Sequence, residues 1–333
     1  MVFFPFAEYW SFYLGFSLFV GLMLALDLGV FHRKAHEVSV KEAGAWTVVW
    51  IALALVFNGL LYFYCFNKFG EGSEILARKL GLEFLSGYVV EKSLAIDNLF
   101  VFAIIFSYFA IPKALQHRVL FYGILGALVF RAVFIAIGTQ LMAYKSVVIF
   151  FGGLLIFTGV KMLFSPSHVM EPERSWILRL VQKMIPVDPK ASPTTFFVLK
   201  KGVRYATPLF LALVFIELTD ILFAVDSVPA IFALTQEPLI VFTSNIFAIL
   251  GLRSMYFLLA GALNRFQYIK YGLSGVLVFV GLKMAWLNEH FGGKFPISWS
   301  LGIIALLIGS SMAYSLYRSR RAPSSVPFPP THS

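Results

Sequence analysis

Stretches of about 20 consecutive apolar residues recur along this 333-residue chain and constrain its fold more than any other feature. Each is long enough to cross, as a helix, a bilayer whose hydrocarbon core is about 30 Å thick. In lipid the backbone polar groups must pair within their own segment, and stretches such as 149–164 lack the alternation of a transmembrane strand. The sequence therefore predicts an all-α polytopic membrane protein, with the lipid bilayer as its main solvent.

Nine membrane spans are expected, at 10–31, 44–66, 84–109, 119–142, 146–164, 207–234, 239–261, 267–287 and 296–317. The segment 165–206 is polar, contains five prolines and seven Lys or Arg, and is expected to be a cytoplasmic loop with one surface helix around 176–184. The tail 322–333 is rich in Pro and Ser and is expected to be disordered.

The distribution of Lys and Arg predicts the orientation. With the N-terminus outside, 17 of them fall in inner loops and 5 in outer loops, which favours an N-out, C-in topology. The formal net charge of +10 therefore reflects cytoplasmic loops, and no nucleic-acid partner is expected. Cys65 is the single cysteine, which excludes a disulfide within the chain and a cysteine-based metal cluster.

A repeated pattern divides the chain. The order of acidic pair, arginine and Lys-Met occurs twice, as Glu91/Asp97, Arg131, Lys161-Met162 and as Asp220/Asp226, Arg253, Lys283-Met284. Each unit has three spans, an odd number, so the two copies must enter the membrane from opposite sides, as in inverted-repeat transporters with substrate sites near the midplane. The predicted organisation is two N-terminal spans (1–83), a first repeat (84–164), the loop (165–206), a second repeat (207–287), a last span (288–321) and the tail (322–333).

Six acidic residues fall within the predicted spans: Asp27, Glu91, Asp97, Glu217, Asp220 and Asp226. A charge at the membrane centre costs roughly 3 kcal/mol or more, so it is seldom left unpaired. One interpretation is a set of structural ion pairs with the intramembrane cations Lys92, Arg131, Lys161, Arg253 and Lys283. The other is a binding site for a cation.

A hard divalent cation takes several oxygen ligands, and Asn98 and Ser227 directly follow Asp97 and Asp226. Residues six apart on one helix differ by about 240° and roughly 9 Å along the axis. Asp97 and Asp226, from opposite helices, are therefore the expected direct ligands. The remaining acids, Glu91, Asp220 and Glu217, would complete the site, gate it or exchange protons.

Four further residues have predicted supporting roles. Pro229 deprives the carbonyl of Val225 of its helical donor, next to Asp226, and marks where that helix is most prone to open. Arg131 and Arg253 are expected to pair with carboxylates rather than to contact a substrate. Asp27 is equally compatible with an anchor and with an ion pathway.

Several chemistries are disfavoured. The six histidines all fall in loops or tails, which argues against a bis-histidine haem or a histidine-rich zinc path. The chain has no Gly-rich phosphate loop, so ATP hydrolysis is not expected. Neither an enzymatic activity nor a tightly bound cofactor is predicted.

The stretches EKSLAIDNLFVF at 91–102 and ELTDILFAVDSVPAI at 217–231 resemble the two signature helices of the TerC family. The length and the number of spans resemble its Alx branch. The resemblance implies a bacterial multi-pass inner-membrane protein related to the LysE-type transporters. It also implies links to manganese export, the alkaline-pH response and tellurite resistance, and a role as a membrane redox modulator has been suggested for Alx-like members.

The residues favour one of these functions. Carboxylates would repel the tellurite anion, whereas Mn(II) is a hard cation that suits carboxylate and carbonyl oxygens. A redox role would need paired cysteines or a cofactor site, and one cysteine supplies neither. We therefore expect Mn(II) as the transported substrate, exported by alternating access with proton coupling as an option. The alternative is a redox modulator or stress scaffold that transports nothing.

Overall fold

The computed structural model describes residues 3–26, 38–69, 73–164, 185–188, 191, 194–200, 202–260, 268–291 and 295–321, without the side chains of 97, 320 and 321. Its long elements are α1 (Phe6–Leu26), α2 (Val40–Lys68), α3 (Ser73–Tyr108), α4 (Lys113–Leu141), α5 (Lys145–Phe164), α7 (Pro208–Phe232), α8 (Pro238–Leu250), α9 (Leu252–Ala260), α10 (Ile269–Leu282) and α12 (Ile297–Arg321). The predicted all-α membrane class is confirmed.

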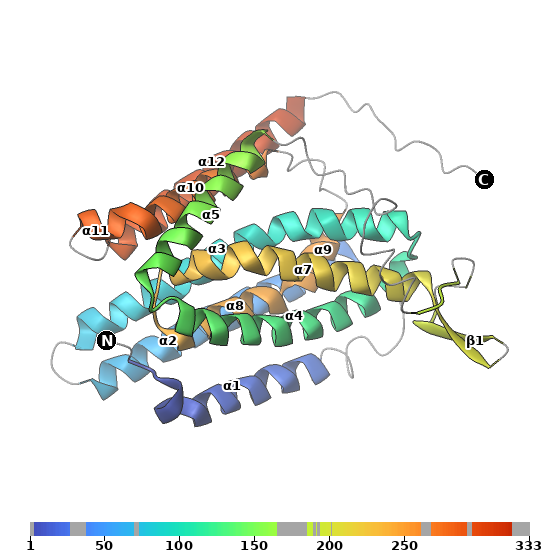
Figure 1. Ribbon diagram of the computed structural model, residues 1–333, viewed down its shortest axis with the longest axis horizontal. Helices are drawn as coiled ribbons and strands as arrows, with labels where there is room; N and C mark the ends of the chain where they lie inside the picture. The colour runs from blue at the N-terminus through green and yellow to red at the C-terminus, as the bar shows by residue number, and fades with distance from the viewer. Residues whose placement is uncertain are drawn as a thin grey trace.

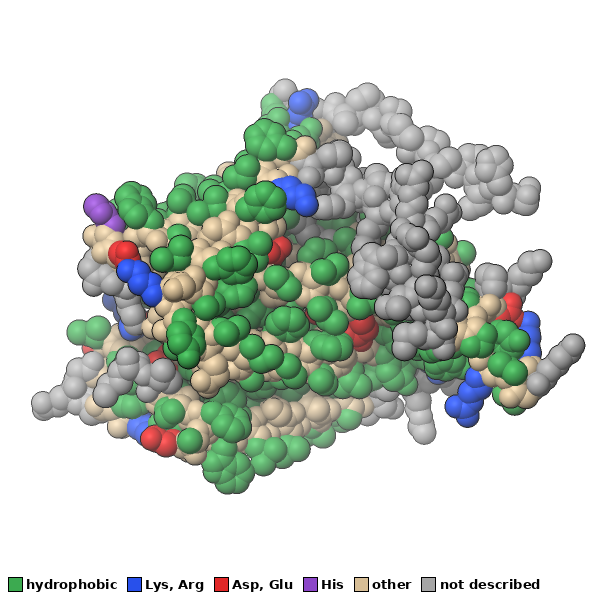
Figure 2. Space-filling model, in the orientation of Figure 1, with side chains coloured by type: hydrophobic (Ala, Val, Ile, Leu, Met, Phe, Trp, Pro, Cys, Tyr) green, Lys and Arg blue, Asp and Glu red, His purple; other side chains and the backbone are tan. Residues whose placement is uncertain are grey.

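Eight segments of the described chain are helices long and apolar enough to cross a membrane, against the nine expected. The expected span that is not among these eight is 84–109, and all of it but the last residue lies in α3. This helix has 36 residues but carries Glu91, Lys92 and Asp97 in its apolar half. Figure 2 shows hydrophobic side chains over most of the visible face, with most charged side chains toward the two ends. That distribution is typical of a lipid-facing belt.

The helices form two groups (Figure 1). In the main bundle α3 packs against α2, α7 and α8, and α4 packs against α7 and α8. Helices α5, α10 and α12 make up the second group, called the arm here, in which α10 packs against both α5 and α12. Figure 1 shows the arm inclined to the helices of the main bundle.

Glycines bring α5 and α10 into close contact. A Cβ atom on Gly159 would lie 2.9 Å from the carbonyl oxygen of Ser274, and one on Gly281 would lie 2.6 Å from that of Gly152. In the sequence repeat Gly159 matches Gly281 and Gly152 matches Ser274, so one contact occurs twice. Small residues allow such an approach, and α5 and α10 therefore pack closely along their contact. The inverted repeat and the membrane orientation stay predictions.

Three elements differ from the sequence expectation. The span expected at 239–261 is broken at Gly251 into α8 and α9, and the span expected at 267–287 ends in a π-helix, η4 (Lys283–Leu287), which is followed by α11 (Asn288–His290). Part of the segment expected to be a loop is an antiparallel hairpin of β1 (Phe197–Lys200) and β2 (Val203–Ala206). β-Branched and aromatic residues flank a turn in which Gly202 has a φ of +81°, a combination that favours a hairpin. Asp27, the expected surface helix at 176–184 and the tail from 322 lie outside the described residues.

Candidate functional site

A buried arginine joins four helices at the centre of the main bundle. The Arg131 guanidinium of α4 forms an ion pair with Glu91 of α3. Its Nη2 atom also lies 3.5 Å from Oδ1 of Asp220 on α7. Nη1 donates a hydrogen bond of 2.6 Å to Oδ1 of Asn245 on α8. The single cation of Arg131 therefore pairs with both Glu91 and Asp220, which lie six residues before the expected ligands Asp97 and Asp226 in the two signature helices.

Burial of the three side chains makes the loss of any one of these ion pairs costly. The side chains of Arg131 and Glu91 are 1% exposed and that of Asp220 is 5% exposed. Asn98 adds a hydrogen bond, in which Nδ2 donates to Oδ1 of Asp220 over 3.4 Å. Removing one partner from a buried ion pair is costly because the other charge is left without compensation. Glu91 and Asp220 are therefore held in place by Arg131.

A cavity of about 300 Å³ opens beside this cluster, between α3, α4, α5, α7 and α10. Its polar lining comes from Glu91, Asn98, Arg131, Thr158, Lys161, Asp226 and Ser227, and the rest of its wall is apolar. Asp226 is half-buried, and its Oδ1 accepts a hydrogen bond of 3.3 Å from Oγ1 of Thr158 on the arm. The central cavity thus lies between the arm and the main bundle.

Several buried oxygen atoms at this site could accept a further hydrogen bond or bind a cation. Within the described part of the chain, Oδ1 of Asn98 and Oδ2 of Asp220 have no hydrogen-bond partner, and Oε2 of Glu91 and Oγ of Ser227 have none outside the contact between these two side chains. Buried polar atoms are normally satisfied, so a group of such oxygens suits a bound cation or water. The described residues contain no set of three or more His, Cys, Asp and Glu side chains placed to hold a metal ion. The side chain of Asp97, the expected partner of Asp226 in binding the ion, lies outside the described residues.

The other predicted residues lie around the cluster. The Glu217 carboxylate packs against Gly126 of α4, where any Cβ atom would collide with it, and its Oε2 has no hydrogen-bond partner within the described structure. Lys92 turns toward α8, where Nζ donates to the carbonyl oxygen of Ala248 over 3.1 Å. Arg253 is buried in α9, 7% exposed. Pro229 is buried in α7, which continues unbroken to Phe232.

Sequence reasoning did not single out Thr158. Its position in the second repeat is occupied by Val280, so a comparison of the two copies conceals it. The available signal was its place three residues before Lys161, one helical turn away on the same face. Asn245 of α8 contacts Arg131 directly.

The fold and the polar centre define a multi-pass integral membrane protein with charged residues buried among its helices. The chain belongs to the integral membrane protein TerC family, whose pattern matches residues 76–323.

Named relatives extend the match along most of the chain. An uncharacterized membrane protein of Myxococcus xanthus is 51% identical over 312 residues, 93% of each chain. A protein of Escherichia coli (strain K12) named "Putative membrane-bound redox modulator Alx" is 45% identical over 292 residues, which are 87% of this chain and 89% of that one. An uncharacterized membrane protein of Rickettsia felis is 38% identical over 295 residues, 88% of this chain and 94% of its own. No solved structure matches the chain significantly.

Proposed function

We propose that this protein transports a hard divalent cation across the bacterial inner membrane, with Mn(II) efflux by alternating access as its activity. The observation that carries the proposal is the central cavity, where carboxylate, amide and hydroxyl oxygens meet inside helices that can cross a membrane. Oxygen donors of these types suit Mn(II). A polar cavity between two groups of helices is also where many secondary transporters bind their substrate.

The charges at the site support a divalent substrate. When their carboxyl groups are ionised, Glu91, Asp220 and Asp226 carry three negative charges against the two positive charges of Arg131 and Lys161. Asp97 precedes Asn98, a residue of the cavity wall, and adds a fourth negative charge. The excess of two negative charges equals the charge of one Mn(II) ion. Neutralisation is important here because an uncompensated charge is costly in a low-dielectric surrounding.

The proposed roles follow from the contacts of the described side chains and, for Asp97, from the sequence. Asp226 binds the ion together with the hydroxyl groups of Thr158 and Ser227, and Asp97 approaches from the opposite helix. Arg131 fixes Glu91 and Asp220 at the edge of the site, where their carboxylate oxygens Oε2 and Oδ2 complete it. Glu217, packed against α4, is the candidate for exchanging a proton.

The test is the manganese content of cells that produce the protein in a strain sensitive to manganese. Asp97→Asn and Asp226→Asn are expected to abolish the lowering of cell manganese. Glu289→Gln is the matched control, because Glu289 is exposed and pairs with Lys145 away from the cavity. If both Asn variants lowered cell manganese as the unmodified protein does, the assignment of the site would be wrong.

The second candidate is a membrane redox modulator, favoured by the name of the Alx relatives. Cys65, the single cysteine, is buried in α2. A redox role would be supported if purified protein in liposomes moved no Mn(II) under a proton gradient, and if replacing Cys65 by Ala abolished the cellular phenotype.

A further inference from the structure

We propose that a pocket at the end of the bundle that the predicted N-out topology places outside, called the outer pocket here, is the outer end of the transport path, and that Val90, Ala230 and Val280 form the gate between it and the central cavity. The inference rests on the proposed function, because it extends the path of the same cation. The outer pocket and the cavity lie on the two sides of one contact between α3, α7 and α10.

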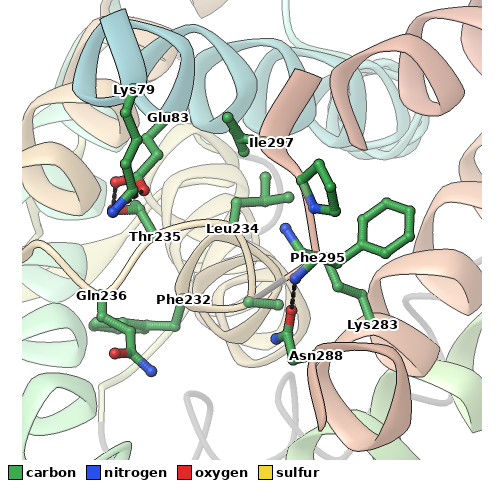
Figure 3. A pocket seen from close by; sticks show the side chains of 12 residues that line it. Lys79, Glu83, Phe232, Leu234, Thr235, Gln236, Lys283, Asn288, Phe295 and Ile297 are labelled. Carbon is green, nitrogen blue, oxygen red and sulfur yellow. Dashed lines mark hydrogen bonds and ion pairs between the residues drawn. The ribbon is translucent and has the colours of Figure 1, made fainter. Parts of the chain in front are cut away.

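The outer pocket has a volume of about 240 Å³, and six of the twelve residues that line it are polar (Figure 3). Thr235, just after α7, donates a hydrogen bond of 2.6 Å from Oγ1 to Oε2 of Glu83 on α3. Lys79 lies 3.8 Å from the other oxygen of Glu83. Across the pocket, Asn288 accepts a hydrogen bond of 3.0 Å from the backbone N–H of Phe295. This polar wall suits water and a hydrated ion, so the pocket is a suitable vestibule.

Two helices pass from the central cavity to the outer pocket within a few residues. On α7, Ser227 lines the cavity and Phe232 lines the pocket. Leu277 of α10 lines the cavity, and Lys283, the first residue of η4 directly after α10, lines the pocket. Six residues of helix span about 9 Å. The barrier between the two spaces is therefore less than two helical turns thick on both helices.

Apolar side chains fill this short interval. Val90 of α3, Ala230 of α7 and Val280 of α10 are each 0% exposed and belong to one hydrophobic cluster, together with Leu155 and Met284. Val90 directly precedes Glu91 of the cavity, and Val280 lies three residues before Lys283 of the pocket. Apolar constrictions block ions because they expel water, and an ion entering one would lose its hydration shell. The contact therefore closes the cavity toward the outer pocket.

The arrangement also indicates how the gate opens. Ala230 belongs to the main bundle, whereas Val280 belongs to the arm, in which glycine contacts hold α5 and α10 together. The π-helix η4 begins three residues after Val280, and a short π-helix is frequently found at a functional site. Tilting of the arm against α3 and α7 would separate Val280 from Ala230 without disturbing the contact between α5 and α10.

The experiment measures from which side of the membrane a thiol reagent reaches a cysteine placed in the central cavity or in the outer pocket. Cys65→Ala removes the native thiol, and Thr158→Cys then reports on the cavity while Asn288→Cys reports on the pocket. A membrane-impermeant thiol reagent added to intact cells is expected to label Asn288→Cys and to leave Thr158→Cys largely unlabelled. Adding Val280→Ala is expected to accelerate labelling of Thr158→Cys about tenfold, the factor for removing two methyl groups from an apolar barrier.

The matched control is Val278→Ala, which makes the same chemical change on the same helix. Val278 contacts Gly159 of α5 and lines neither space. The proposal is overturned if Thr158→Cys is labelled as fast as Asn288→Cys without the gate substitution. It is also overturned if Asn288→Cys reacts only in inside-out vesicles, if Val280→Ala leaves labelling unchanged, or if Val278→Ala accelerates it equally.

Labelling does not depend on metal transport, so the two proposals fail separately. Loss of protection of Thr158→Cys, when the unmodified protein transports Mn(II) normally, would contradict the gate alone. The expected labelling pattern without any Mn(II) flux would contradict the proposed substrate and leave the gate standing.

Discussion

Replacing Arg131 by methionine removes the cation that Glu91 and Asp220 share and keeps much of the side-chain volume. All three side chains are at most 5% exposed, so water cannot take over the lost interaction. Breaking one buried ion pair costs about 3–5 kcal/mol. Because two carboxylates lose their partner in this variant, we expect a loss of free energy of unfolding toward the upper part of that range.

A compensating variant separates charge from packing. In Arg131→Met/Glu91→Gln/Asp220→Asn no charge is left at the centre, and replacing a whole buried ion pair by uncharged groups is often nearly neutral. The triple variant should therefore recover most of the stability that Arg131→Met loses. Unfolding in mixed detergent micelles, followed by the fluorescence of the six tryptophans, measures both changes.

Arg78→Met is the control, because Arg78 is exposed on α3 and its replacement should cost no more than about 0.5 kcal/mol. A loss below about 1 kcal/mol for Arg131→Met would refute the reasoning, since buried pairs cost several times more. A triple variant no more stable than Arg131→Met would refute it as well.

Three further predictions use other contacts. Gly281→Leu should separate α5 from α10 and lower the free energy of unfolding in micelles by about 1–3 kcal/mol, whereas Gly302→Leu, with open space around it, should not. Thr158→Val removes the hydroxyl that donates to Asp226 and should raise the KM for Mn(II) without changing stability, whereas Thr139→Val should leave the KM unchanged. Burial raises the pKa of the Glu237 carboxyl, which accepts hydrogen bonds from the backbone of Phe3 and Phe4. The folded protein therefore holds this proton more tightly, and stability should fall as pH rises above about 4.5, a slope that Glu237→Gln should remove in melting curves.

The chain's membrane fold could be predicted from the sequence because the cost of exposing polar backbone to lipid leaves helices as the available choice for long apolar segments. The cost of burying charge likewise singled out the acids and arginines of the spans. Arg131 illustrates this, since a mid-span cation near two acids has few alternatives to an ion pair.

The remaining features depend on tertiary packing. The spacing of residues did not indicate that one arginine serves acids from both repeats, because that depends on how α3, α4 and α7 approach one another. The break at Gly251 and the π-helix after Leu282 follow from local packing, and hydropathy averaged over a span conceals both. α7 continues through Pro229 to Phe232, because a helix tolerates the loss of one hydrogen bond when its neighbours pack closely, and the role of Pro229 in opening this helix stays a prediction.

The most direct test of the central proposal is Mn(II) flux into liposomes that contain the purified protein, under an imposed proton gradient. We expect flux above that of empty liposomes, its loss in Asp226→Asn, its retention in Glu289→Gln, and competition by other hard divalent cations. Flux no higher than in empty liposomes, or full flux in Asp226→Asn, would contradict a cation path through the cavity between the arm and the main bundle.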